Sequence, residues 1–152
     1  MYWLPYLILV INLVIIWQMP KNLTKQEIYI SWCVIALINL STDVVFSFYF
    51  KLYELAGPGV QLPVHLIELT LGASFGIIFL NFTPEKIRPF LLYAGAWIVI
   101  SMIFEIAFVK VHFLNYFTWK PWYSPPYYFG ALLYLRWHLW FLRKPESYHD
   151  KT

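Results

Sequence analysis

The stretch PEKIRPFLLYAGAWIVISMIFEIAFVK, residues 84–110, carries no charged side chain between Arg88 and Glu105. An α-helix needs about 20 predominantly apolar residues to cross the hydrocarbon core of a membrane, and this stretch is long enough. Inside that core the backbone polar groups have no water to bind, and an α-helix satisfies them within the segment. The stretch therefore predicts a membrane-spanning helix.

The composition of the whole chain indicates the same class of protein. Of its 152 residues, 61% are apolar, 22% are aromatic and 12% are charged, whereas a soluble domain has about 25% charged residues. In water such a chain would expose large apolar patches, and it lacks the low hydrophobicity and high net charge of a disordered chain. We therefore expect an integral membrane protein, with the lipid bilayer as its solvent.

Charge and cysteine content exclude two further classes. The net charge is +3, but Lys and Arg are scattered along the chain and form no basic stripe, so nucleic acid is not an expected partner. Cys33 is the only cysteine, which excludes a scaffold held together by internal disulfides.

Four further apolar runs, bounded by turn residues or charges, complete the predicted bundle. They cover residues 3–19, 28–50, 63–82 and 126–142. The sequence thus predicts an all-α fold, an integral membrane bundle of five transmembrane helices in one domain (1–144), followed by a polar cytoplasmic tail (145–152).

Helix-start signals precede several of these runs. Thr24 and Glu27 have the spacing of a capping box before the second run, in which each side chain accepts a hydrogen bond from the other residue's backbone. Pro63 and Pro84 suit the first turns of the third and fourth runs, and Thr83 is the expected cap of the fourth.

The fifth run contains Arg136 and His138. A charge near the centre of a span costs about 2.5–3.5 kcal/mol on insertion scales. If Arg136 lies close to the cytoplasmic end, its long side chain can reach the membrane surface, and most of this cost disappears. We therefore expect the span to form, with both residues as anchors.

The basic residues predict an orientation, because Lys and Arg are retained on the cytoplasmic side. With five spans, one side of the membrane collects Lys21, Lys25, Lys86, Arg88, Arg143, Lys144 and Lys151. The other side collects Lys51, Lys110 and Lys120. This distribution predicts a multi-pass protein with its N-terminus outside and its C-terminus inside.

Three carboxylates, Asp43, Glu68 and Glu105, fall inside three different predicted spans. Ionisable groups in a span need a partner, a water-filled cavity or a function. At the rise of an α-helix, all three lie about 7–12 Å below the outer boundary in the predicted orientation. One polar cavity open to the outside would serve all of them, and His65 lies one turn from Glu68 on the same helix face.

We therefore predict an outward-facing cavity. Its expected binding residues are Asp43, His65, Glu68 and Glu105. Its expected mouth comprises Lys51, Glu54, Lys110, His112, Trp119 and Trp122. Aromatic residues around Trp119 also suit an ordinary membrane-interface belt.

A structural interpretation competes with the binding interpretation. The three carboxylic acids would then pair with neighbours or stay protonated, and each would hold two helices together. Gly72 and Gly76 have the small-xxx-small spacing that lets helices pack closely.

Catalytic and metal-binding motifs are weak or missing. His65 and the three carboxylates offer ligands for a divalent metal or a proton relay, but a single His-x-x-Glu is neither the two-histidine motif of zinc proteases nor the paired Glu-x-x-His of di-iron bundles. The sequence contains no nucleophile elbow, phosphate loop or dinucleotide fingerprint. No catalytic residue, metal or other cofactor is predicted.

Three stretches carry a family resemblance. They are residues 119–124 (WKPWYS) after Glu105, residues 79–84 (FLNFTP), and Asp43 followed by residues 48–50 (FYF). Over residues 24–144 the chain resembles an uncharacterised family of small multi-spanning membrane proteins of spore-forming Bacillota. The resemblance implies a membrane fold, a bacterial cytoplasmic membrane and a sporulation or germination context, and it supplies no catalytic residues.

Three hypotheses of function follow. The first is a binding or accessory membrane protein that uses the polar cavity for a cation, a lipid headgroup or a partner helix. The second is a proton-coupled transporter subunit, which at five spans would need a second copy, with Gly72 and Gly76 as a candidate contact. The third is an intramembrane lipid-modifying enzyme.

Overall fold

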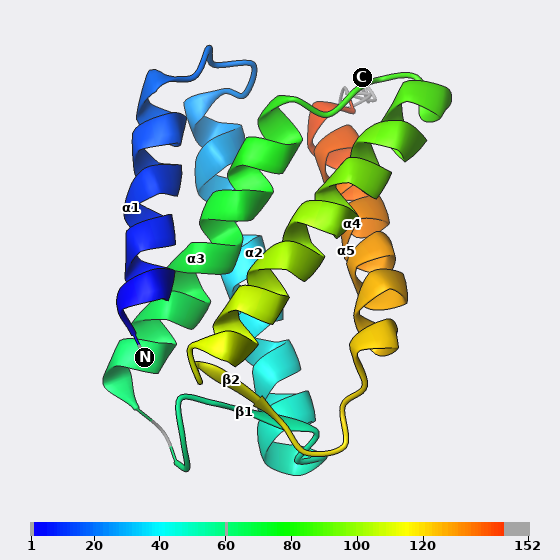
Figure 1. Cartoon of the computed structure of the whole chain (residues 1–152). Coiled ribbons are helices and arrows are strands. Elements are labelled where there is room, and N and C mark those ends of the chain that lie inside the picture. Colours follow the sequence, from blue (N-terminus) through cyan, green and yellow to red (C-terminus); the bar gives the residue numbers. More distant parts are fainter. Residues whose placement is uncertain (1, 60, 145–152) are drawn as a thin grey trace, which may run out of the picture.

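The computed structural model describes residues 2–59 and 61–144. This part of the chain runs up and down as antiparallel helices (Figure 1). The helices are α1 (Trp3–Gln18), α2 (Lys25–Asp43), α3 (Leu62–Asn81), α4 (Ile87–Lys110) and α5 (Ser124–Arg143). A π-helical segment, η1 (Val44–Tyr49), continues α2, and a 3₁₀ turn, η2 (Pro121–Tyr123), precedes α5. The predicted all-helical class is confirmed.

Within the described residues, three helical segments are long and apolar enough to cross a membrane. They are Lys25–Tyr49, Leu62–Asn81 and Ile87–Lys110. These segments correspond to the predicted spans 28–50, 63–82 and 84–110. Trp3–Gln18 is apolar but shorter. The predicted tail, residues 145–152, lies outside the described residues.

One predicted helix start is confirmed and another is wrong. The Thr24 hydroxyl accepts a hydrogen bond from the Glu27 amide at 3.1 Å, and the Thr24 amide donates to the Glu27 carboxylate at 2.8 Å, which completes the capping box. However, α4 begins at Ile87 rather than Pro84. The Thr83 hydroxyl donates instead to the Phe79 carbonyl at 2.8 Å, so it closes the end of α3 and does not cap α4.

The most buried helix is α3, with α1 and α2 packed against it. Gly72 and Gly76 face α2: a Cβ atom added at Gly72 would lie 1.8 Å from Asn39 Nδ2, and one at Gly76 would lie 2.4 Å from Ile35 Cδ1. The two glycines therefore allow close packing within one chain. Because α2 already packs on this face of α3, the two glycines are not available for contact with a second copy of the chain.

The end of α3 is fixed to the α1–α2 connection by Asn81, whose side chain is buried. Its carboxamide oxygen accepts from the Asn22 amide at 3.0 Å, and its nitrogen donates to the Pro20 carbonyl at 2.9 Å. We call this end of the bundle, together with the α3–α4 connection, the upper end.

Arg136 also reaches towards the upper end. Its guanidinium lies 4.3 Å from the centroid of the Phe90 ring, and its Nη2 donates to the Glu85 carbonyl at 2.6 Å. His138 instead contacts the hydroxyl of Ser31 at 3.1 Å, where both side chains are buried. These contacts hold α5 against α4 and α2.

Arg143, in the last turn of α5, forms an ion pair with Glu27 at 2.7 Å and donates to the Asn22 carbonyl at 2.9 Å. Its side chain is 45% exposed, so solvent screens the pair. We expect a double-mutant cycle of Arg143→Ala and Glu27→Gln, followed by chemical unfolding, to give a small favourable coupling free energy of about 0.2–1 kcal/mol. No coupling at all would contradict the contact between the end of α5 and the start of α2.

A two-stranded sheet closes the opposite end, which we call the lower end (Figure 1). Strands β1 (Tyr53–Leu55) and β2 (Leu114–Tyr116) pair antiparallel, with Tyr53 opposite Tyr116. The Leu52 carbonyl accepts from the amides of three consecutive residues, 117–119, at 3.0–3.1 Å. The sheet thereby joins the α2–α3 connection to the α4–α5 connection.

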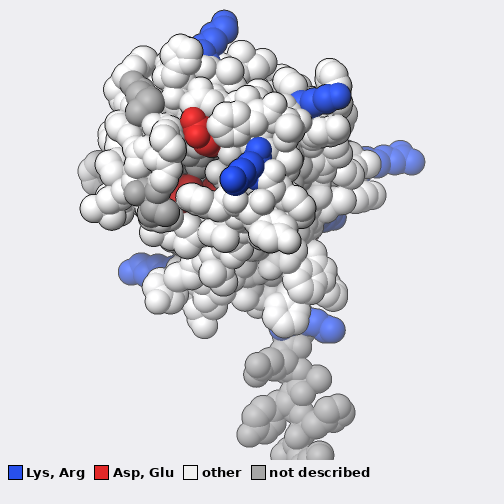
Figure 2. All heavy atoms as spheres, turned by 90° about the horizontal axis from the view of Figure 1, so that it is seen from below, with Lys and Arg blue, Asp and Glu red and all other residues white. Residues whose placement is uncertain are grey.

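Charged side chains are unevenly arranged on the lower face. Figure 2 shows acidic side chains at two neighbouring places within this face, with one basic side chain beside them and the other visible basic side chains at the rim. One of the acidic places is partly covered by neighbouring atoms.

Candidate functional site

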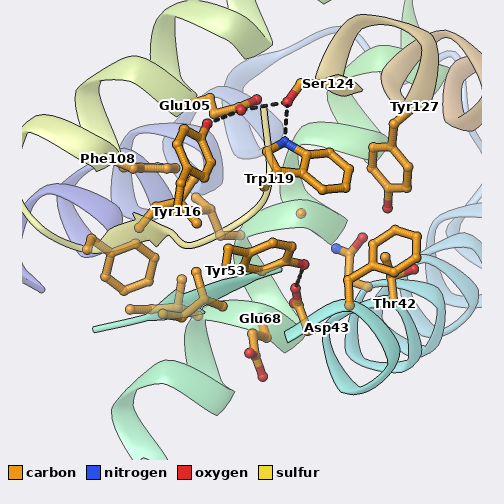
Figure 3. A pocket seen from close by; sticks show the side chains of 18 of the residues that line it. Thr42, Asp43, Tyr53, Glu68, Glu105, Phe108, Tyr116, Trp119, Ser124 and Tyr127 are labelled. Carbon is orange, nitrogen blue, oxygen red and sulfur yellow. Dashed lines mark hydrogen bonds between the residues drawn. The ribbon is translucent and has the colours of Figure 1, made fainter. Parts of the chain in front are cut away.

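A cavity of about 270 Å³ lies between the sheet and the lower halves of α2, α3, α4 and α5. Asp43, Glu68 and Glu105 all line it, so the structure brings the three predicted carboxylates to one cavity. In the view of Figure 3, Glu105 lies on one side of it and Asp43 and Glu68 on the other, with the rings of Tyr53 and Trp119 between them. We call this the polar cavity.

Glu105 lies within a cage of hydroxyl groups and is 5% exposed. One carboxylate oxygen accepts from Ser124 at 2.6 Å and from the Tyr116 hydroxyl, and the other accepts from Tyr128 at 2.6 Å. The indole of Trp119 donates to the Ser124 oxygen at 3.0 Å, which orients the serine proton towards Glu105 (Figure 3). The cage orients Glu105 through neutral donors only.

Asp43 accepts a hydrogen bond from Tyr53, the residue opposite Tyr116 in the sheet. Opposite residues of an antiparallel pair project from the same face, so the sheet directs one tyrosine to each of two carboxylates. Burial raises the pKa of Tyr53, and the neighbouring Asp43 raises it further. Burial likewise raises the pKa of Tyr116, as does its bond to Glu105. Both phenols therefore stay protonated and act as donors.

Glu68 stands at the boundary between two cavities. Its carboxylate contacts His65 Nδ1 at 2.7 Å, and the Glu68 side chain is 6% exposed. The second cavity, of about 560 Å³, is lined by His65, Glu68, Lys51 and Glu54 among others. His65, predicted to share the cavity of the carboxylates, instead lies in this neighbouring one and reaches the polar cavity only through Glu68.

Of the six predicted mouth residues, three line a cavity and three do not. Trp119 lines the polar cavity, and Lys51 and Glu54 line its neighbour. Three residues, Lys110, His112 and Trp122, line none of these cavities and are exposed. The same connection contributes Phe113, Leu114 and Tyr116 to the polar cavity, directly after His112, which adopts a left-handed conformation with φ of 56°.

The hydroxyl donors were not predicted from the sequence. Ser124 and Tyr128 lie near the start of α5, and Tyr53 and Tyr116 lie in strands that pair across about sixty residues of chain. Neither 51–55 (KLYEL) nor 113–117 (FLNYF) alternates strictly between polar and apolar residues, which is the signal that a half-buried strand usually gives. The sequence therefore offers no local pattern from which these strands could have been predicted.

The wall of the polar cavity combines three carboxyl groups with aromatic rings. It is lined by no Lys, Arg or His from the described residues, while Phe46, Tyr53, Trp119 and Tyr127 contribute rings. The Tyr53 and Trp119 rings meet edge to face at 6.0 Å between centroids. Carboxylates together with ring faces attract a cation, and quaternary ammonium groups are bound in this way.

The donor set does not suit a metal ion. Among the described residues, no group of three or more His, Cys, Asp or Glu side chains is close enough to hold one. The hydroxyl groups around Glu105 already occupy both of its oxygens. An ammonium-type cation, by contrast, needs charge and ring faces rather than a ligand shell of fixed geometry.

No family model, no curated protein and no solved structure matches this chain.

Proposed function

We propose that the protein is a five-span membrane protein that binds an ammonium-type cation in the polar cavity, as a binding or accessory protein rather than as an enzyme. The observation that carries this proposal is the lining of that cavity: three carboxylates from three helices, aromatic walls, and no basic side chain from the described residues. A cation is the ligand that this lining complements.

The distribution of basic residues supports an orientation with the cavity facing outwards. The lower end carries Lys51, Lys110 and Lys120, while the upper end carries Lys21, Lys25, Lys86, Arg88, Arg143 and Lys144. Because cytoplasmic segments are the richer in Lys and Arg, the upper end is the cytoplasmic one in our proposal. The alternation of the helices is consistent with α1 and α5 as the first and fifth spans.

The proposal is tested by titrating the purified full chain, in a neutral maltoside detergent, with tetramethylammonium chloride and recording the heat of binding. We expect saturable binding that weakens about tenfold or more in Asp43→Asn, which keeps the acceptor oxygen for Tyr53 but removes the charge. The matched control is Glu85→Gln, which removes an exposed carboxylate in the α3–α4 connection at the other end of the bundle.

Two results would contradict the proposal. One is the absence of saturable binding to the wild-type chain. The other is equal affinity in the wild type and in Asp43→Asn, since binding would then not depend on the charge in the cavity.

A further inference from the structure

A third cavity, larger and more apolar, adjoins the polar cavity. It has a volume of about 680 Å³ and extends between α2, α3, α4 and α5. Nine residues line both cavities, so the two cavities share a continuous wall. The shared residues are Asn39, Thr42, Leu71, Gly72, Glu105, Phe108, Leu114, Tyr127 and Tyr128.

Aromatic side chains keep α3 and α4 apart along this space, which we call the apolar cavity. The ring of Phe75 lies 6.3 Å from Trp97 and 5.1 Å from Phe104, and the ring of Phe79 lies 5.8 Å from Trp97, all between centroids. Its wall away from the polar cavity is almost entirely apolar, with Ser101 as an exception. Cavities of this size and lining hold the apolar part of small ligands.

The linings of the two cavities together complement an amphiphile. One end offers carboxylates and ring faces, and the other offers apolar surface between helices that enter the membrane in the proposed topology. Neither cavity is lined by Lys, Arg or His from the described residues, so the pair lacks a partner for a phosphate or carboxylate headgroup. Charge complementarity favours a cationic headgroup.

We infer that the ligand is a single-chain amphiphile with a cationic amine headgroup, the headgroup in the polar cavity and the hydrocarbon chain in the apolar cavity. This inference rests on the proposed function and adds to it the second half of the ligand. The chain would lie between α3, α4 and α5, and the headgroup near Asp43 and Glu105.

Two glycines provide a matched pair of variants. Gly130 in α5 lines the apolar cavity, and a Cβ atom there would meet nothing within 4 Å. Gly95 in α4 also has nothing within 4 Å of an added Cβ, but it lines none of the three cavities. Gly130→Leu therefore fills part of the apolar cavity, while Gly95→Leu makes the same chemical change elsewhere.

The experiment compares tetramethylammonium with butyl-, octyl- and decyltrimethylammonium on the purified full chain in maltoside detergent, with bound ligand counted by native mass spectrometry. We expect affinity to rise at least about tenfold from the headgroup alone to the decyl compound, because the cavity accommodates the added methylenes. Gly130→Leu should remove most of this gain and leave tetramethylammonium binding unchanged. Gly95→Leu should leave both unchanged.

The outcomes separate the two proposals. If tetramethylammonium binds but the decyl compound binds no more tightly, the amphiphile inference is wrong and the cation site stands. The same conclusion follows if Gly130→Leu and Gly95→Leu weaken binding of the decyl compound equally. If no trimethylammonium compound binds, both are wrong. The chain-length series on the wild-type protein decides the question even if Gly130→Leu does not fold.

Discussion

Replacing Glu105 with alanine is expected to lower the free energy of unfolding by about 3 kcal/mol, since each of three lost hydrogen bonds contributes on the order of 1 kcal/mol. The carboxylate is buried and accepts from Tyr116, Ser124 and Tyr128, which belong to β2 and the start of α5. Without it the three hydroxyl groups lose their common acceptor, and α4 loses its link to α5 at the lower end.

The measurement is unfolding of the purified chain in mixed micelles by increasing dodecyl sulfate, followed by circular dichroism. Glu105→Gln keeps one acceptor oxygen and should lose less stability than Glu105→Ala. Glu85→Ala, which removes an exposed carboxylate, should change the free energy of unfolding by less than about 0.5 kcal/mol. Wild-type stability in Glu105→Ala would show that the hydroxyl cage does not hold the helices together.

Replacing Gly76 with leucine is the second change with a large expected effect. The added Cβ would lie 2.4 Å from Ile35 Cδ1, and the rest of the leucine would have to enter the interface between α2 and α3. Overpacking a tight core costs about 1–3 kcal/mol, and we expect the upper part of this range because both Gly76 and Ile35 are buried.

The same micelle unfolding measures the effect of Gly76→Leu. Its control is Gly95→Leu, since a Cβ at that helical glycine meets nothing within 4 Å and the change should be close to neutral or slightly stabilising. Equal stability of the two variants would contradict the close approach of α2 and α3.

The helices were predictable because their signals are local. Apolar runs, the Thr24–Glu27 capping box and Pro63 in the first turn of α3 lie within a few residues of the boundaries that they set. The start of α4 was predicted three residues early, because the bond from Thr83 to the Phe79 carbonyl depends on where α3 ends. A sequence does not show which of two adjacent helices a threonine will serve.

The residues of the site could be predicted only where their distance from one end of the bundle determines which cavity they line. Asp43, Glu68 and Glu105 share a cavity because each lies a similar distance from the same end of an antiparallel bundle. Their partners Tyr53 and Tyr116 depend on a strand pairing between distant connections, which no local pattern specifies. Lys110 and Trp122 were misplaced because their side chains were assigned by sequence position, while the fold of the connection sets where they lie.

In the function that we propose, the polar cavity opens to the outside of the cell and its carboxylates attract cations. This claim can be tested in intact cells with the variant Thr42→Cys, at a position lining both the polar and the apolar cavity, in a Cys33→Ser background. Two methanethiosulfonate reagents are compared, one with a cationic trimethylammonium group and one with an anionic sulfonate group. The ratio of their modification rates is measured at Thr42→Cys and at Trp122→Cys, an exposed reference position. We predict that the ratio of the cationic to the anionic rate is about tenfold or more higher at Thr42→Cys than at the reference. Equal relative rates, or modification only after the cells are permeabilised, would contradict the claim.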